Sequence, residues 1–167
     1  MKTKRAIIIL SLLVIGISSC KNPEGKKTEA KDAQDVKQES TGDIKYNIQP
    51  EKSKVHWTGT KPGGEHVGTV KVKEGNIKMN EKGIQNAMVI LDMTSIENQD
   101  IEKESNRKKL VGHLKSKDFF DVENFPEARF ELTNATKVQD ENNDFTHKVS
   151  GNLTIKKKKK NISFRIK

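Results

Sequence analysis

Short runs in which apolar and polar residues alternate fill the chain beyond its first quarter, and they predict β-strands. In residues 53–59, Val55 and Trp57 lie on one face of such a strand, and the polar side chains between them lie on the other. Alternation returns in residues 69–79, where Glu74-Gly75-Asn76 has the composition of a tight turn. This second run therefore predicts a hairpin.

The rest of this region continues in short elements. Residues 87–93 are apolar at both odd and even positions, so the pattern does not show which side of this strand faces the core. Residues 100–113 favour a helix with Asp100 as a candidate N-cap, and residues 116–121 favour a short aromatic turn. Turn residues recur about every ten positions, which favours a sandwich or barrel over a βαβ fold. Further strands are expected around Phe130, Leu132, Val149, Leu153 and Ile155.

The N-terminal 19 residues have the pattern of a signal peptide. A short basic start is followed by the apolar residues 6–17, which are too few for the roughly 20 residues of a membrane-spanning helix. Ile17-Ser18-Ser19-Cys20 then resembles the bacterial lipobox and contains the only cysteine of the chain. This pattern predicts cleavage before Cys20 and lipidation of its thiol. The lipid would hold the protein on a membrane, because two or more acyl chains give stable anchoring.

This anchor predicts an exported protein attached to the cell envelope. Lys21 directly after the lipidated residue favours the outer membrane, with the protein facing the periplasm. Residues 20–43 contain one valine and no leucine, isoleucine or aromatic residue, so they predict a disordered charged tether. The folded domain is expected to occupy residues 44–167.

The net charge of +9 first suggests a nucleic-acid partner. Residues 1–19 carry three of the cations and no acids, which leaves +6 after cleavage. The run Lys156–Lys160 carries five of those six charges. Because the excess lies in a targeting segment and one homopolymer run, we expect no nucleic-acid binding.

Several short sequence motifs beyond residue 44, taken in order, resemble those of the YceI-like family of bacterial exported proteins. The most specific is Leu110-Val-Gly-His113-Leu-Lys-Ser116-Lys-Asp-Phe119-Phe120-Asp121, which is followed by Phe125-Pro126-Glu127-Ala128-Arg129-Phe130. The others are Ser53-x-Val55-x-Trp57, Gly64-x-His66-x-Gly68, Leu91-Asp-Met-Thr-Ser-Ile96 and Gly151-Asn-Leu153-Thr-Ile155-Lys156. The resemblance covers roughly residues 46–164.

The resemblance implies a mainly β protein, a lipocalin-like antiparallel β-barrel with one or two short helices. It also implies a lumen that holds a long isoprenoid or similar amphiphilic lipid. Of the predicted lining residues, Phe119 and Phe120 either contact the ligand or plug one end of the barrel. His66 and His113 are expected to fix loops or to line the cavity mouth. The predicted lining consists of Val55, Trp57, Val70, Val72, Val89, Leu91, Phe119, Phe120, Phe130 and Leu132.

Metal binding and catalysis are not expected, and neither is a cofactor. The four histidines form no HxH or HExxH spacing, and lipidation leaves no free cysteine. Ser116, His113 and Asp118 are close in sequence, but no G-x-S-x-G pattern surrounds the serine. The residue pattern leaves the oligomeric state open.

The chain departs from the family pattern near its C-terminus. Five lysines, Lys156–Lys160, follow the strand where the family has a glycine-containing turn. The chain also ends at Lys167, about where the last one or two strands of the family are expected. We therefore expect an incomplete barrel from a truncated reading frame. The lysine run supports an alternative function, a surface module that docks on anionic lipid or another polyanion.

Overall fold

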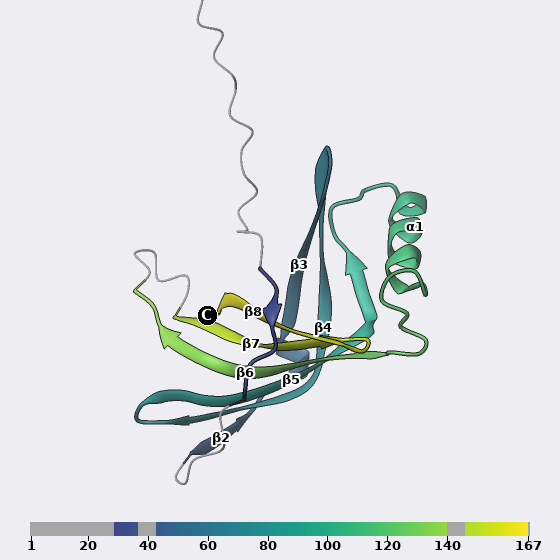
Figure 1. Cartoon of the computed structure of the whole chain (residues 1–167). Helices are drawn as coiled ribbons and strands as arrows, with labels where there is room; N and C mark the ends of the chain where they lie inside the picture. The colour runs from purple at the N-terminus through teal and green to yellow at the C-terminus, as the bar shows by residue number, and fades with distance from the viewer. Residues whose placement is uncertain (1–28, 37–42, 140–145, 167) are drawn as a thin grey trace, which may run out of the picture.

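All strand pairs of the structure are antiparallel, as the short alternating runs predict (Figure 1). This computed structural model describes residues 29–36, 43–139 and 146–166. The predicted signal peptide and Cys20 lie outside the described residues. The described elements are β1 (Lys31–Asp32), β2 (Ile44–Asn47), the 3-10 helix η1 (Pro50–Lys52), β3 (Lys54–Lys61), β4 (Gly64–Asn80), β5 (Gly83–Asn98), α1 (Glu104–Lys115), β6 (Glu127–Lys137), β7 (His147–Ile155) and β8 (Lys158–Ile166).

The strands form one sheet in the order β1-β8-β7-β6-β5-β4-β2, and β3 also pairs with β4. Among the described residues this sheet curls without closing. The predicted fold class, a mainly β antiparallel lipocalin-like structure with one or two short helices, is confirmed. None of the helices in the described ranges is long and apolar enough to cross a membrane.

The hairpin predicted at residues 74–76 is wrong, because β4 runs straight through that position. Gly75 pairs with Val89 of β5, and the chain turns only after Asn80, where Gly83 has a φ of +98°. The register of β4 and β5 shifts between Val72 and Glu74. Such a β-bulge inserts an unpaired residue and breaks the alternation of side chains, so in sequence it looks like a turn.

Irregular pairing also bends the sheet. A second register shift separates Thr69 from Lys71, and between Lys71 and Asn76 β4 changes its partner from β3 to β2. Figure 1 shows β3 and the first half of β4 standing upright, whereas the rest of β4 lies with β5 below β6 and β7. The bend brings strands from both ends of the sheet to opposite sides of one concave face.

Two clusters of buried apolar side chains form the core. The helix-side cluster has Val70, Met93, Ile96, Leu114 and Ala128 at its centre, all at most 8% exposed. The open-side cluster has Ala87, Phe130, Leu132 and Val149 at its centre. Leu153 packs against both and joins them into one apolar layer.

The sequence pattern of β5 did not show which of its residues face the core. The two clusters identify these residues. Ala87 and Val89 belong to the open-side cluster, and Leu91 and Met93 belong to the helix-side cluster. The odd-numbered residues of this segment therefore face the core. Ile90 is also only 6% exposed but belongs to neither cluster.

Asp100 does not cap α1, contrary to the sequence-based prediction. The helix begins at Glu104, with Lys103 in the N-cap position. The carboxylate of Asp100 instead accepts a hydrogen bond from the backbone N–H of Val67, at 2.8 Å, and lies 2.7 Å from Nδ1 of His66. Contacts with β4, which are distant in sequence, therefore override the local capping preference.

Part of the predicted tether has a defined place on the sheet, which corrects the prediction for residues 29–36. Lys31 and Asp32 form β1 on the free edge of β8, opposite Asn161 and Lys160. The side chain of Asn152, 2% exposed, exchanges two hydrogen bonds with the backbone of Gln34, at 3.0 and 2.6 Å. An open strand edge and a buried amide both need partners, and composition alone does not show where those partners lie.

Candidate apolar binding face

The open-side cluster lines the concave face of the sheet. Its members lie on one side because residues paired across neighbouring strands share a face, as Leu132, Gly151 and Ile162 do. Around the buried centre lie partly buried side chains from five strands. These are Ile77, Ile84, Val89, Ala135, Leu153, Ile162 and Ile166.

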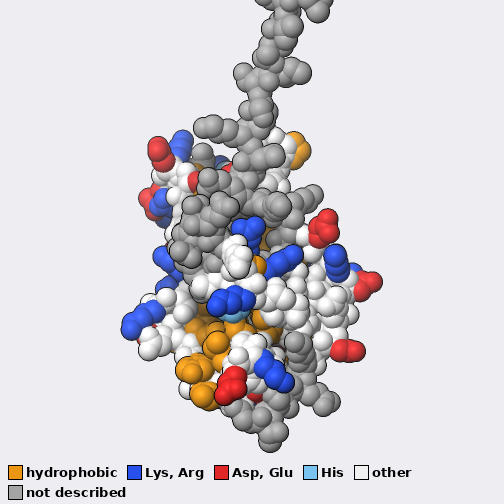
Figure 2. All heavy atoms as spheres, turned by 90° about the vertical axis from the view of Figure 1, so that its left-hand side faces the viewer, with side chains coloured by type: hydrophobic (Ala, Val, Ile, Leu, Met, Phe, Trp, Pro, Cys, Tyr) orange, Lys and Arg blue, Asp and Glu red, His pale blue; other side chains and the backbone are white. Residues whose placement is uncertain are grey.

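The face stays partly exposed on β2 and on β8. On β2, Ile44 is 60% and Tyr46 is 52% exposed, and their partners Met79 and Ile77 place them on the same face. On β8, Phe164 is 39% exposed, and its ring lies 5.2 Å from that of Phe130. Figure 2 shows hydrophobic side chains gathered on the lower half of this side of the molecule, with charged residues around them. The protein therefore carries a continuous apolar surface that its described residues only partly cover.

A model of the YceI-like domain matches residues 46–167, well over half of the chain. The chain belongs to the YceI-like family. Among solved structures, it resembles a crystal structure of a mutant CJ YceI protein with a monobromobimane guest structure, at 16% identity and a TM-score of 0.38. That match covers 87% of this chain but only 62% of the other, so this chain spans less than two thirds of that protein. No curated protein sequence matches the chain.

Most of the predicted lining residues of the YceI-like domain lie in one of the two clusters. Val89, Phe130 and Leu132 lie on the open-side cluster, as a binding face requires. Trp57, Val70, Leu91 and Phe120 pack in the helix-side cluster instead. Val72 is buried outside both clusters, and Val55 is 38% exposed on β3.

Phe119 and Phe120 lie differently in the turn after α1. Phe120 packs against the helix-side cluster, and its N–H donates to the carbonyl of Leu114 at 3.1 Å. Phe119 is 46% exposed and stacks edge-on against Phe120, with the ring centroids 4.6 Å apart, and against His113 at 5.9 Å. This arrangement favours the plug over the ligand contact for Phe120, and it places His113 against the turn.

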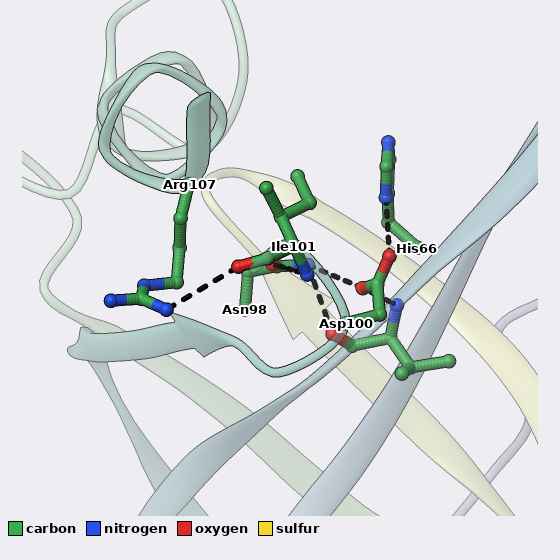
Figure 3. Close-up of polar contacts among 6 residues, drawn as sticks. His66, Asn98, Asp100, Ile101 and Arg107 are labelled. Atoms are coloured by element: carbon green, nitrogen blue, oxygen red, sulfur yellow. Dashed lines mark hydrogen bonds and ion pairs between the residues drawn. The ribbon is translucent and has the colours of Figure 1, made fainter. Parts of the chain in front are cut away.

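His66 belongs to a polar network that fixes the loop between β5 and α1 (Figure 3). The carboxylate of Asp100 lies 2.7 Å from Nδ1 of His66 and accepts a hydrogen bond from the N–H of Val67. The side-chain amide of Asn98 also donates to Asp100, at 2.6 Å. The loop continues into α1, where Arg107 donates to the carbonyl of Ile101 at 3.3 Å. Burial acts against the charged carboxylate, but the hydrogen bonds from His66, Val67 and Asn98 and the charge of His66 hold the pKa of Asp100 at about 2.

We expect this network to make stability depend on pH in the acid range. Because the pKa of Asp100 is depressed from 3.8 to about 2, its contribution is complete above pH 4 and is lost as pH falls toward 2. About a third of the side chain is exposed, so solvent screening limits this contribution to about 1 kcal/mol. Urea unfolding of Asp100→Asn should therefore vary less between pH 5 and pH 2 than that of the wild type.

The matched control is Asp118→Asn. Asp118 is an exposed carboxylate with no hydrogen-bond or ion-pair partner within the described ranges. Its variant should follow the wild-type profile. If Asp100→Asn follows the wild type as closely as Asp118→Asn does, the network contributes nothing to stability.

The lysine run does not form one basic face. A two-residue turn at Lys156 and Lys157 separates β7 from β8, so the next lysines point alternately to the two sides of β8. Lys156 has a φ of +54°, a left-handed conformation that favours glycine, and its ammonium group donates to the carbonyls of Lys117 and Phe119. Lys159 pairs with Glu131 and Lys160 with Asp32.

The residues that the sequence analysis missed lie mainly on β2 and β8. Ile162, Phe164 and Ile166 alternate with polar residues, so a period-two search extended to residue 166 would have found them. Ile44 and Tyr46 show the same spacing. Within the described ranges, no group of three or more metal-ligating side chains gathers at this face or elsewhere.

Proposed function

We propose that this YceI-like domain binds the apolar chain of an amphiphilic lipid along its open-side cluster, without catalysis. The observation that supports this most is an apolar face running from β2 to β8 whose edge residues Ile44, Tyr46 and Phe164 remain exposed. A long isoprenoid fits such a face because it offers many methyl groups and few polar atoms. The lipid on Cys20 anchors the domain to the envelope, at the periplasmic side of the outer membrane.

The energy available is sufficient for binding alone. Removing apolar surface from water contributes about 25 cal/mol per Å², so several hundred Å² of lipid chain contribute roughly 10 kcal/mol before ordering costs. Two polar side chains considered in the sequence analysis, those of Ser116 and His66, have structural partners. Ser116 donates its hydroxyl to the carbonyl of His113 at 2.8 Å and ends α1, and His66 binds Asp100.

The alternative, docking on a polyanion through Lys156–Lys160, has less support. The ammonium groups of Lys156, Lys159 and Lys160 bind oxygen atoms of the same chain, and that of Lys157 lies 5.9 Å from the ring centre of Phe125. Strong salt dependence of membrane association, without a co-purified lipid, would favour that alternative.

A paired substitution on β2 tests the apolar face. We expect Tyr46→Ser to weaken binding of a fluorescent long-chain lipid about tenfold, because an exposed aromatic ring that contacts the lipid contributes about 1.5 kcal/mol. The measurement uses the full chain in detergent, with native mass spectrometry and organic extraction of any co-purified lipid. Phe164→Ser should act in the same direction from the other edge.

Asn47→Ser is the control, because Asn47 is the next residue of β2 and lies on the opposite face. It should leave the affinity unchanged. Equal affinities of Tyr46→Ser, Phe164→Ser and the wild type would exclude this face as the binding surface. A wild-type chain that retains no lipid and binds none would contradict the proposed function itself.

A further inference from the structure

A second candidate site lies between α1 and the end of β5. Here the structure has an open groove of about 620 Å³. None of its lining residues belongs to either apolar cluster, so the groove is separate from the proposed lipid face. The lining consists of Glu97, Asn98, Arg107, Lys108, Val111, Gly112 and Lys115.

The groove holds positive charge that the protein does not neutralise. Lys108 pairs with Glu104 one turn earlier, at 2.7 Å. Arg107 and Lys115 are both half-buried, and neither has an ion-pair partner in the described part of the chain. Glu97 is the only acid of the lining. Partly desolvated cations without a counterion raise the energy of the folded state, so an anion from solution would stabilise this groove.

Arg107 is held in an orientation that suits a ligand. One guanidinium nitrogen donates to the carbonyl of Ile101 at 3.3 Å, and Figure 3 shows the other end of the group pointing away from that loop. A guanidinium carries five N–H donors in a planar fork. The fixed fork therefore keeps further donors for a planar or tetrahedral oxyanion.

Gly112 gives independent support, because it sits inside α1 without a packing reason. Glycine within a helix lowers its stability relative to alanine. A Cβ built on Gly112 would meet no other atom within 4 Å, so no neighbour requires the glycine. Lys108, Gly112 and Lys115 follow one another at spacings of four and three on one helix face. The missing side chain leaves open space between the two lysines, against the helix backbone.

We propose that this groove binds a small phosphate-bearing anion. Arg107 supplies directed hydrogen bonds, Lys115 supplies charge, and the ligand rests on the helix at Gly112. Phosphate fits better than a single carboxylate, because two cations without an ion-pair partner among the described residues line the groove and its volume exceeds that of one carboxylate group. The proposal is independent of the proposed lipid function.

Titration of the full chain with inorganic pyrophosphate at constant ionic strength tests the site. We expect saturable binding by the wild type, and about tenfold or greater weakening in Lys115→Gln, the usual effect of losing a charge-assisted hydrogen bond. Lys109→Gln is the matched control, because Lys109 is an exposed lysine of α1 outside the groove. It should change the affinity less than about twofold, because screened surface charges contribute little.

Gly112→Leu places a bulky side chain in the groove, where we propose that the ligand rests on the helix, without removing a charge. We expect it to abolish pyrophosphate binding while raising Tm by a few degrees, since leucine is a better helix former. A folded, stabilised variant without binding separates the site from a folding defect. Absence of wild-type binding, equal losses in Lys109→Gln and Lys115→Gln, or wild-type affinity in Gly112→Leu would each overturn the proposal.

Discussion

Gly68→Ala should destabilise the domain by about 3 kcal/mol or more, a large part of the usual 5–15 kcal/mol. A Cβ on Gly68 would overlap the carbonyl oxygen of Glu97 and would lie 2.6 Å from Cε2 of Trp57. The backbone oxygen belongs to β5, which pairs with β4 at this position, so relief requires the strands to separate. The free energy of unfolding in urea measures this cost.

Gly64→Ala is the matched control in the same strand. A Cβ on Gly64 would meet nothing within 4 Å, and its backbone does not have the positive φ that favours glycine. The two variants therefore make the same chemical change in β4 with and without a neighbour. Equal urea midpoints would show that β5 and Trp57 do not approach Gly68 as closely as described.

Gly151→Ala should have the second largest effect, about 2–3 kcal/mol. A Cβ there would overlap the ring of Phe130 and lie 2.6 Å from the carbonyl oxygen of Glu131. Phe130 is 8% exposed at the centre of the open-side cluster, so its ring has little room to move. The same variant should weaken lipid binding, because a displaced ring changes the surface that we propose for the ligand.

A double-mutant cycle with Phe130→Leu checks this explanation. Leucine removes the ring atoms that the new Cβ would meet, so the double variant should be more stable than the sum of the two single effects predicts. The contact with the backbone of Glu131 remains, so the rescue should be incomplete. Strictly additive effects would place the cost of Gly151→Ala outside its contact with the ring.

These two glycines show what the alternation of residues could and could not predict about the fold. The pattern located β3, β6 and β7, because each is a short strand with regular side-chain spacing. It failed at Gly75, where a bulge and a turn leave the same break in alternation. It also gave no sign that Trp57 lies over Gly68 and Phe130 over Gly151, because such contacts depend on the register between strands.

The candidate site was predicted only in part, for a related reason. Val89, Phe130 and Leu132 were assigned to the lining, and they lie on the open-side cluster. Trp57 and Phe120 belong to the other cluster, because α1 and its turn close that part of the sheet. Which apolar residues are covered by a helix is a tertiary property, and alternation within a strand carries no information about it.

If Cys20 carries the proposed lipid, the pairing of β1 with β8 limits how far the domain can stand from a membrane. Residues 21–30 then separate the anchor from Lys31, the first residue paired on the sheet edge. Eleven peptide steps span at most about 40 Å when fully extended, compared with about twice that for a free tether to residue 44. Under the proposed function, the lipid anchor would then keep the domain near the bilayer surface, where a lipid could pass between the membrane and the apolar face.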